Sequence, residues 1–221
     1  CKLPKIIKEE IHPFDEVQIS AFLKAIEGNK FEVIFIVTLF TGLREGEVLG
    51  LTWSCVDFER NTITIDKQMQ LHQEKDMIPY QLVSVKNSRS RVIAVAPFVM
   101  EQLKRHKVHQ AEQRLRAGAM WQPSDLIFTN EVGDHITKSS LYRAFKKTAA
   151  SIGRPDARFH DLRHSYAVAA IRSGDDIKTV QGNLGHATAA FTLDVYGHVT
   201  DEMKRDSASR MEAFIKKVSS T

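Results

Sequence analysis

Four features of this chain contain residue types that can hold an anion, transfer a proton or act as a nucleophile. The first, residues 41–47, reads Thr-Gly-Leu-Arg-Glu-Gly-Glu, and its glycine breaks an apolar helix so that Arg44 points away from the helix end. Glu47 follows Arg44 by three residues, about one helical turn, so its carboxylate can hold the guanidinium. A surface arginine in a weak helix-terminal ion pair would have the same spacing, so this string alone decides nothing.

The second string, residues 159–165, reads Phe-His-Asp-Leu-Arg-His-Ser and places several polar side chains on one helical face. His160 is three residues from Arg163 and four from His164. Two histidines four residues apart can also bind zinc, but the string lacks the glutamate of the metalloprotease motif. His160-Asp161 also matches a metal phosphohydrolase dyad, which is a common chance dipeptide. For His164, packing or capping of the helix is the alternative.

The other two features, a Leu-Gly-His string followed by a tyrosine and a predicted polar turn, contribute a histidine, a tyrosine and a lysine. In the Leu-Gly-His string of residues 184–186, Gly185 ends one helix and His186 precedes the next, where it can equally be a loop residue or a partner of the helix dipole. Tyr196 follows ten residues later and can equally be a half-buried aromatic whose hydroxyl finds a partner. Lys86 lies in a polar stretch between two expected strands, where most lysines are solvated turn residues.

The elements that must position these residues show two periodicities. Apolar residues at helical spacing, with capping signals such as Asp15-Gln18 and Pro97, predict helices. Alternation of polar and apolar residues predicts three strands, at 62–65, 82–85 and 92–95, and residues 126–128 fit a further short strand. We expect 82–85 and 92–95 to form a hairpin around the polar turn 86–91. The predicted helices cover 15–28, 31–40, 45–51, 97–118, 137–153, 161–173, 177–184, 189–196 and 201–218.

This pattern predicts a mostly α protein with a small antiparallel β-sheet in its first half, in the α+β class. The 221 residues suit one large domain or one domain with a small appendage, and no apolar run approaches the ~20 residues of a membrane span. The two cysteines form no disulfide framework and no metal cluster, which favours a reducing cytoplasm.

The net charge of +4 is unevenly distributed along the chain. Residues 84–116 contain eight Lys and Arg against two Glu, and residues 137–178 contain nine against four Asp. Such stretches can converge on one face and attract a polyanion, or they can be ordinary solvated helix faces, and charge alone favours neither.

Taken together and in order, six residues resemble the signature of the tyrosine recombinase (phage integrase) family. The resemblance runs from about residue 15 to residue 200 and rests on the strings at 41–47, 159–165 and 184–186 and on Tyr196-Gly197-His198. It implies the catalytic domain fold of that family, with no metal and no other cofactor. The family's lysine lies on a strand hairpin, where Lys86 falls, although Lys67 and Lys75 lie in the same region. The six residues are Arg44, Lys86, His160, Arg163, His186 and Tyr196.

The resemblance implies a role for each residue that suits the chemistry. Arg44 and Arg163 would clamp the non-bridging oxygens of the phosphate, with a hydrogen bond from His186. Tyr196 would attack phosphorus and leave a 3′-phosphotyrosyl link with a free 5′-hydroxyl, so that rejoining needs no ATP. The remaining roles are proton acceptor or hydrogen-bond partner of the tyrosine for His160, general acid for Lys86 and orientation of Arg44 for Glu47.

The resemblance also implies a domain layout and partners. We expect residues 1–13 to be a linker from a missing N-terminal DNA-binding region, 14–200 the catalytic domain and 201–221 a C-terminal helix. The apolar face of that helix packs either on its own core or on a neighbouring subunit. The implied partners are double-stranded DNA, a homotetramer on two DNA sites and accessory DNA-bending proteins, with no membrane, in the bacterial cytoplasm at the nucleoid.

Three rival functions share some of these features. A type IB topoisomerase uses the same chemistry to relax DNA, but the Thr-Gly-Leu-Arg and Leu-Gly-His strings favour a recombinase that integrates or excises a mobile element. A DNA-binding relative without catalysis would not need the full residue set. A metal-dependent phosphohydrolase would be distinguished by sensitivity to EDTA.

Overall fold

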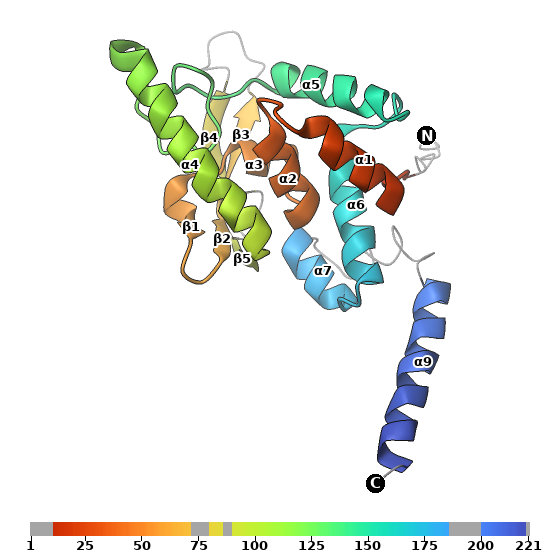
Figure 1. Ribbon diagram of the computed structural model, residues 1–221. Coiled ribbons are helices and arrows are strands. Elements are labelled where there is room, and N and C mark those ends of the chain that lie inside the picture. Colours follow the sequence, from red (N-terminus) through yellow and green to blue (C-terminus); the bar gives the residue numbers. More distant parts are fainter. Residues whose placement is uncertain (1–10, 72–79, 86–89, 186–199, 220–221) are drawn as a thin grey trace, which may run out of the picture.

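A computed structural model of the protein describes residues 11–71, 80–85, 90–185 and 200–219. It is mostly helical with small antiparallel sheets, so the predicted fold class is confirmed (Figure 1). The helices are α1 (Glu16–Ile26), α2 (Glu32–Thr41), α3 (Glu45–Leu49), α4 (Pro97–Ala117), α5 (Lys138–Ser151), α6 (Phe159–Arg172), α7 (Ile177–Leu184) and α9 (Thr200–Ser219). The strands are β1 (Val56–Asp57), β2 (Thr62–Ile65), β3 (Lys67–Leu71), β4 (Tyr80–Ser84) and β5 (Arg91–Ala94), and short 3₁₀ turns cover Trp53–Cys55 and Gly118–Met120.

The helix α2 is the one around which the others pack. Its sequence is apolar almost throughout, and a helix without a polar face has to be buried on most sides. α1, α3, α4 and α6 all contact it, and α5 lies across α1 and α6 (Figure 1). Between α1, α2, α5 and α6 the core is filled by phenylalanine rings with centroids 5.7–6.2 Å apart: Phe22, Phe35, Phe145 and Phe159.

The strands form a three-stranded sheet in the order β1-β2-β5 and a two-stranded sheet of β3 and β4, all antiparallel. Only Asp66 separates β2 from β3, and its carbonyl accepts a hydrogen bond from the backbone N–H of Val85 at 3.0 Å. The stretch 62–71 is therefore one side of a long hairpin, and β4 and β5 are successive parts of its other side.

The predicted hairpin between residues 82–85 and 92–95 is wrong. Both segments pair with the stretch 62–71 instead of with each other, in different sheets. The strand that pairs with β4 was not predicted, because β3 reads Lys-Gln-Met-Gln-Leu and only its Met69 is buried. A strand with a single buried side chain shows almost no alternation of polar and apolar residues.

Two smaller expectations also need correction. Residues 126–128 form no strand: Leu126 makes an isolated bridge to Thr52, and the next two residues are buried in the core. α6 begins at Phe159, two residues before the predicted start, because the carboxylate of Asp161 accepts the backbone N–H of Arg158 at 2.8 Å and caps the first turn.

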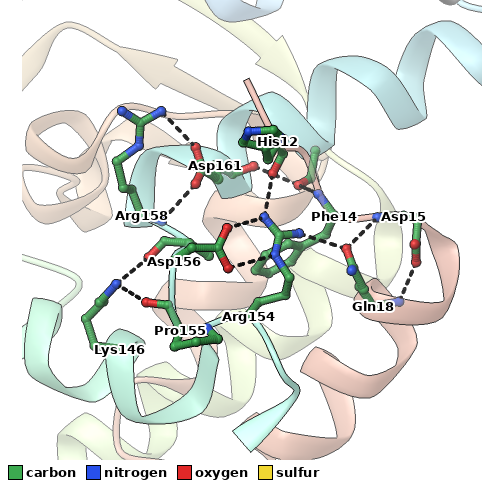
Figure 2. Close-up of polar contacts among 12 residues, drawn as sticks. His12, Phe14, Asp15, Gln18, Lys146, Arg154, Pro155, Asp156, Arg158 and Asp161 are labelled. Atoms are coloured by element: carbon green, nitrogen blue, oxygen red, sulfur yellow. Dashed lines mark hydrogen bonds and ion pairs between the residues drawn. The ribbon is translucent and has the colours of Figure 1, made fainter. Parts of the chain in front are cut away.

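The first described residues are fixed to α6 and to the loop before it, as Figure 2 shows. Arg154 donates to the carbonyl of His12 at 3.0 Å and to the side chain of Gln18 at 2.9 Å. The backbone N–H of Phe14 donates to the buried Ser165 hydroxyl of α6 at 2.8 Å. The chain therefore reaches α1 along a fixed path beside α6.

The C-terminal helix α9 lies apart from the other helices (Figure 1). It extends the predicted helix by one residue at each end, and its apolar side chains Met211, Phe214, Ile215 and Val218 are 52–59% exposed. The predicted helix 189–196 lies outside the described residues, as does most of the predicted linker 1–13. None of the helices in the described parts of the chain is long and apolar enough to cross a membrane.

Candidate active site

Two helix ends meet at Arg163 of α6. Each end is turned by a glycine in the left-handed conformation, Gly42 after α2 with φ 66° and Gly185 after α7 with φ 63°. The Arg163 guanidinium donates to the carbonyl of Gly42 and to that of Leu184, both at 2.7 Å. The last carbonyls of a helix lack partners inside the helix and carry the negative end of its dipole. Arg163 is only 2% exposed, so these carbonyls offset the desolvation of its charge.

Arg44 lies beside the same two helix ends, immediately before α3. Its Nη1 donates to Oε1 of Glu47 at 2.9 Å, so the ion pair expected from the sequence spacing is present. Its backbone N–H donates to Oε2 of Glu47 at 3.0 Å, and its Nη2 donates to the carbonyl of Gly185 at 3.3 Å. The Arg44 side chain is 42% exposed, so a ligand can reach this guanidinium from solvent.

Glu47 is a buried carboxylate held by two arginines. Besides Arg44 it accepts from Arg91 of β5, whose Nη1 and Nη2 lie 3.0 and 2.7 Å from Oε1 and Oε2. Burial raises the pKa of Glu47, but the hydrogen bonds and charges of Arg91 and Arg44 outweigh burial and lower that pKa to about 2. Glu47 is therefore ionised at neutral pH although its side chain is only 2% exposed.

His160 and His164 lie on α6 with their ring centroids 4.7 Å apart. Burial lowers the pKa of His160, and the charge of Arg163 lowers it further, more than Asp161 raises it. Burial, followed by His160, lowers the pKa of His164 to about 4. Both rings are therefore neutral at neutral pH. Among the described residues, no third His, Cys, Asp or Glu joins them in a group that could hold a metal ion.

An open cleft of about 760 Å³ runs along this part of the molecule. Arg44 and His160 line it together with the first residues of α3, the strand β3 and Lys138 at the start of α5. Lys138 lies 3.7 Å from the carboxylate of Glu45. The lining of the cleft thus combines two cationic side chains, Arg44 and Lys138, with one imidazole, His160, and one carboxylate, Glu45.

The structure brings together Arg44 and Glu47, from the start of α3, with His160 and Arg163 of α6. The other three predicted site residues, Lys86, His186 and Tyr196, lie outside the described residues. His186 directly follows Gly185, whose carbonyl is bonded to Arg44. Of the two alternative lysines, Lys67 lies in β3 opposite Ser84, and Lys75 lies outside the described residues.

Two residues of this neighbourhood were missed by the sequence analysis. Arg91 was assigned to a polar turn, and nothing in its local sequence indicates the contact with Glu47, which is 44 residues away. Lys138 belongs to the basic stretch 137–178, but its spacing from the other site residues carries no signal. Both reach the site through the packing of elements that are distant in sequence.

The chain is similar in sequence to a known protein family and to several curated proteins. A family model described as "Phage integrase family" matches residues 13–203. The tyrosine recombinase XerC-like protein of Caldanaerobacter subterraneus subsp. tengcongensis is 32% identical over 215 residues, covering 93% of this chain and 55% of that protein. The ICEBs1 integrase of Bacillus subtilis is 28% identical over 187 residues, covering 82% of this chain and 48% of that protein. The chain thus spans about half the length of these curated relatives.

Solved structures share the fold. The Tn1549 transposon integrase, in complex with transposon right end DNA, aligns with a TM-score of 0.75 and 23% identity over 93% of this chain and 67% of that chain. The XerA recombinase aligns with a TM-score of 0.68 and 23% identity over 91% of this chain and 65% of that chain.

Proposed function

The chain belongs to the phage integrase family, and from this premise we propose that it is the catalytic part of a tyrosine recombinase that integrates or excises a mobile element. It would cut and rejoin DNA strands at specific sites through a covalent phosphotyrosine. The observation that carries the proposal is the convergence of Arg44 and Arg163 at the ends of α2 and α7, where Arg44 lines an open cleft together with the neutral His160.

The guanidinium groups of Arg44 and Arg163 carry the positive charge that the transition state of phosphodiester cleavage requires. Attack on a phosphodiester builds negative charge on the non-bridging oxygens, and fixed arginines stabilise that charge without having to reorganise. Arg163 is held by two carbonyls, and Arg44 is held by Glu47 and by the carbonyl of Gly185. His186, the next residue along the chain, would donate a further hydrogen bond to the same oxygens.

The proton transfers can be assigned to named side chains. The hydroxyl of Tyr196 attacks phosphorus and loses its proton to His160, whose low pKa keeps the ring neutral and able to accept it. The bond from phosphorus to the 5′ oxygen breaks, and that oxygen takes a proton from Lys86. The product is a 3′-phosphotyrosyl link and a free 5′-hydroxyl, and the reverse steps join a new strand.

We extend the proposal to the partners of the chain. The Tn1549 integrase was solved in complex with transposon end DNA, and by analogy this chain binds double-stranded DNA along the cleft lined by Arg44 and Lys138. It acts as a homotetramer on two DNA sites at the bacterial nucleoid, assisted by DNA-bending proteins. Residues 14–200 form the catalytic unit after a linker, 1–13, from a DNA-binding region, and residues 201–221 form a helix. The exposed apolar face of α9 favours packing on a neighbouring subunit.

A nicked suicide substrate tests the chemistry directly. The DNA site is first recovered by in vitro selection with the chain from a random duplex library, and this selected duplex is then nicked next to the point of cleavage. We expect a covalent protein–DNA adduct in the presence of EDTA. Replacing Tyr196→Phe should abolish the adduct and leave binding of the selected duplex largely unchanged. An adduct that persists in this variant would exclude Tyr196 as the nucleophile, and an adduct that requires a metal ion would contradict the mechanism.

A further inference from the structure

The last two carbonyls of α7 and the carbonyl of Gly185, which caps the helix, each accept a hydrogen bond from a different arginine. The carbonyls of residues 183, 184 and 185 accept, in that order, from Nε of Arg91 at 2.8 Å, Nη2 of Arg163 at 2.7 Å and Nη2 of Arg44 at 3.3 Å. Two of these arginines belong to the proposed phosphate clamp. The third, Arg91, comes from the sheet and has no role in that clamp.

Arg91 makes its other two hydrogen bonds to Glu47, one from each Nη to each carboxylate oxygen. This is the planar fork-to-fork geometry in which arginine binds a carboxylate most strongly, and a lysine cannot reproduce it. Arg91 is 13% exposed and Glu47 is 2% exposed, so solvent screens the pair little. A single side chain therefore joins β5, α3 and the end of α7.

This arrangement limits how Glu47 can bind Arg44. Because Arg91 occupies both carboxylate oxygens, the guanidinium of Arg44 makes one bond to Glu47 and directs its Nη2 to the carbonyl of Gly185. If Arg91 were absent, Glu47 would be free to take Arg44 in a fork-to-fork pair of its own. Arg44 would then turn away from the end of α7, and the carboxylate would neutralise more of its positive charge.

Gly185 leaves the space that Arg91 occupies. A Cβ at this glycine would lie 3.0–3.3 Å from the guanidinium atoms of Arg91, which is a tight contact, and its φ of +63° already disfavours any other residue. The glycine of the Leu-Gly-His string therefore has two functions: it turns the chain at the end of α7 and it admits Arg91 beside that turn.

We propose that Arg91 is a positioning residue of the reaction: by holding Glu47 and the end of α7, it keeps the guanidinium of Arg44 available to the scissile phosphate. It acts through Glu47 and does not itself contact DNA. The inference rests on the proposed function, because the role of Arg44 does.

The test compares single-turnover adduct formation on the nicked selected duplex for the unaltered chain, Arg91→Ala, Arg91→Lys and the control Arg60→Ala. Arg60 is an arginine paired with an aspartate at 3.9 Å in a turn, and its side chain is 84% exposed. At saturating DNA we expect Arg91→Ala to slow adduct formation about 100-fold, the order of loss that follows misplacement of a catalytic group by about 1 Å. We expect Arg91→Lys to slow it about 10-fold, because the charge remains but the fork does not. The Kd for the duplex should change by less than about threefold, because the phosphate clamp itself remains.

The outcomes separate this inference from the proposed function. If the unaltered chain forms no adduct, the proposed function fails. If it forms one and Arg91→Lys reacts within threefold of it, the positioning role is wrong, and this comparison decides even if Arg91→Ala does not fold. A loss confined to the Kd would make Arg91 a DNA-binding residue and would also overturn the inference.

A second measurement distinguishes positioning from a merely structural role. In a Glu47→Gln background there is no carboxylate that could bind Arg44 and turn it away from the end of α7. Adding Arg91→Lys to this variant should therefore slow adduct formation by less than about threefold, whereas Arg91→Lys alone should slow it about 10-fold. An equal loss in both backgrounds would show that Arg91 does not act through Glu47.

Discussion

Replacing Glu47→Gln removes the negative charge that lies between Arg44 and Arg91 and leaves the size of the side chain almost unchanged. The glutamine presents one acceptor and one donor where the carboxylate presents two acceptors. Its NH₂ group therefore faces an Arg91 nitrogen, and two donors oppose each other in a site that is 2% exposed. We expect the variant to fold, with reduced stability at neutral pH.

The pKa of Glu47 sets the magnitude of this loss. The two arginines lower that pKa from 4.5 to about 2, although burial acts in the opposite direction, and each pKa unit corresponds to about 1.4 kcal/mol. The ionised carboxylate therefore contributes about 3 kcal/mol to the free energy of unfolding at neutral pH. A group with a depressed pKa contributes its full stability above the unfolded value, and that contribution is lost as the pH falls from about 4.5 towards 2.

Urea unfolding of both proteins at several pH values measures the effect. At pH 7 the unaltered protein should exceed Glu47→Gln by about 3 kcal/mol, and the difference should shrink steadily below pH 4.5. Other carboxylates titrate in the same range, but they are common to both proteins and cancel in the comparison. The slope of the free energy against urea should be the same in both proteins, because the surface exposed on unfolding does not change.

The reasoning would be refuted by a difference that stays constant between pH 7 and pH 3. Such a result would mean that the glutamine destabilises the fold through shape alone. A variant as stable as the parent at pH 7 would show that the two arginines merely balance the cost of burying the carboxylate.

Two further predictions concern the packing that supports the site. Gly50→Ala should lower the free energy of unfolding by about 2–3 kcal/mol, because the new Cβ would lie 2.7 Å from the backbone nitrogen of Met69 in β3. The control Gly28→Ala should cost only about 1 kcal/mol, because that Cβ would have no atom within 4 Å and only its φ of +71° disfavours alanine. Equal losses for the two variants in thermal unfolding would contradict the steric argument. Ser165→Ala should lower the free energy of unfolding by about 2 kcal/mol, because the buried N–H of Phe14 loses its acceptor. In the control Ser173→Ala, the exposed hydroxyl that is removed donates to a carbonyl of its own helix, and an equal loss of stability for the two variants in calorimetry would disprove the prediction.

The helical part of the fold follows from the sequence because its signals are local. The apolar run of α2, the Asp15-Gln18 capping box of α1 and Pro97 at the start of α4 each act within a few residues, and each predicted element is present. The sheet pairing was not predictable in the same way. Its register depends on β3, whose polar side chains look like loop residues until the strand is paired.

In the site, too, contacts between residues close in sequence were predictable and contacts between distant residues were not. The contact of Arg44 with Glu47 spans three residues and could be read from the sequence, as could the shared face of His160 and Arg163. The contacts of Arg91 with Glu47 and of Arg163 with Gly42 span 44 and 121 residues, and only the packed fold creates them. The family resemblance brought the strings together, but it gave no indication of what holds the arginines in place.

The two carbonyls that hold Arg163 also determine when its side chain loses its freedom of rotation. An arginine side chain carries about 2 kcal/mol of rotamer entropy, and here that freedom is lost during folding, before any DNA arrives. Arg44 is also held, by Glu47 and by the carbonyl of Gly185, but its side chain is 42% exposed, so it is enclosed less completely than Arg163. Both proposed clamp residues therefore lose rotamer entropy when the chain folds, Arg163 more completely than Arg44, and DNA binding does not have to supply that part of the cost.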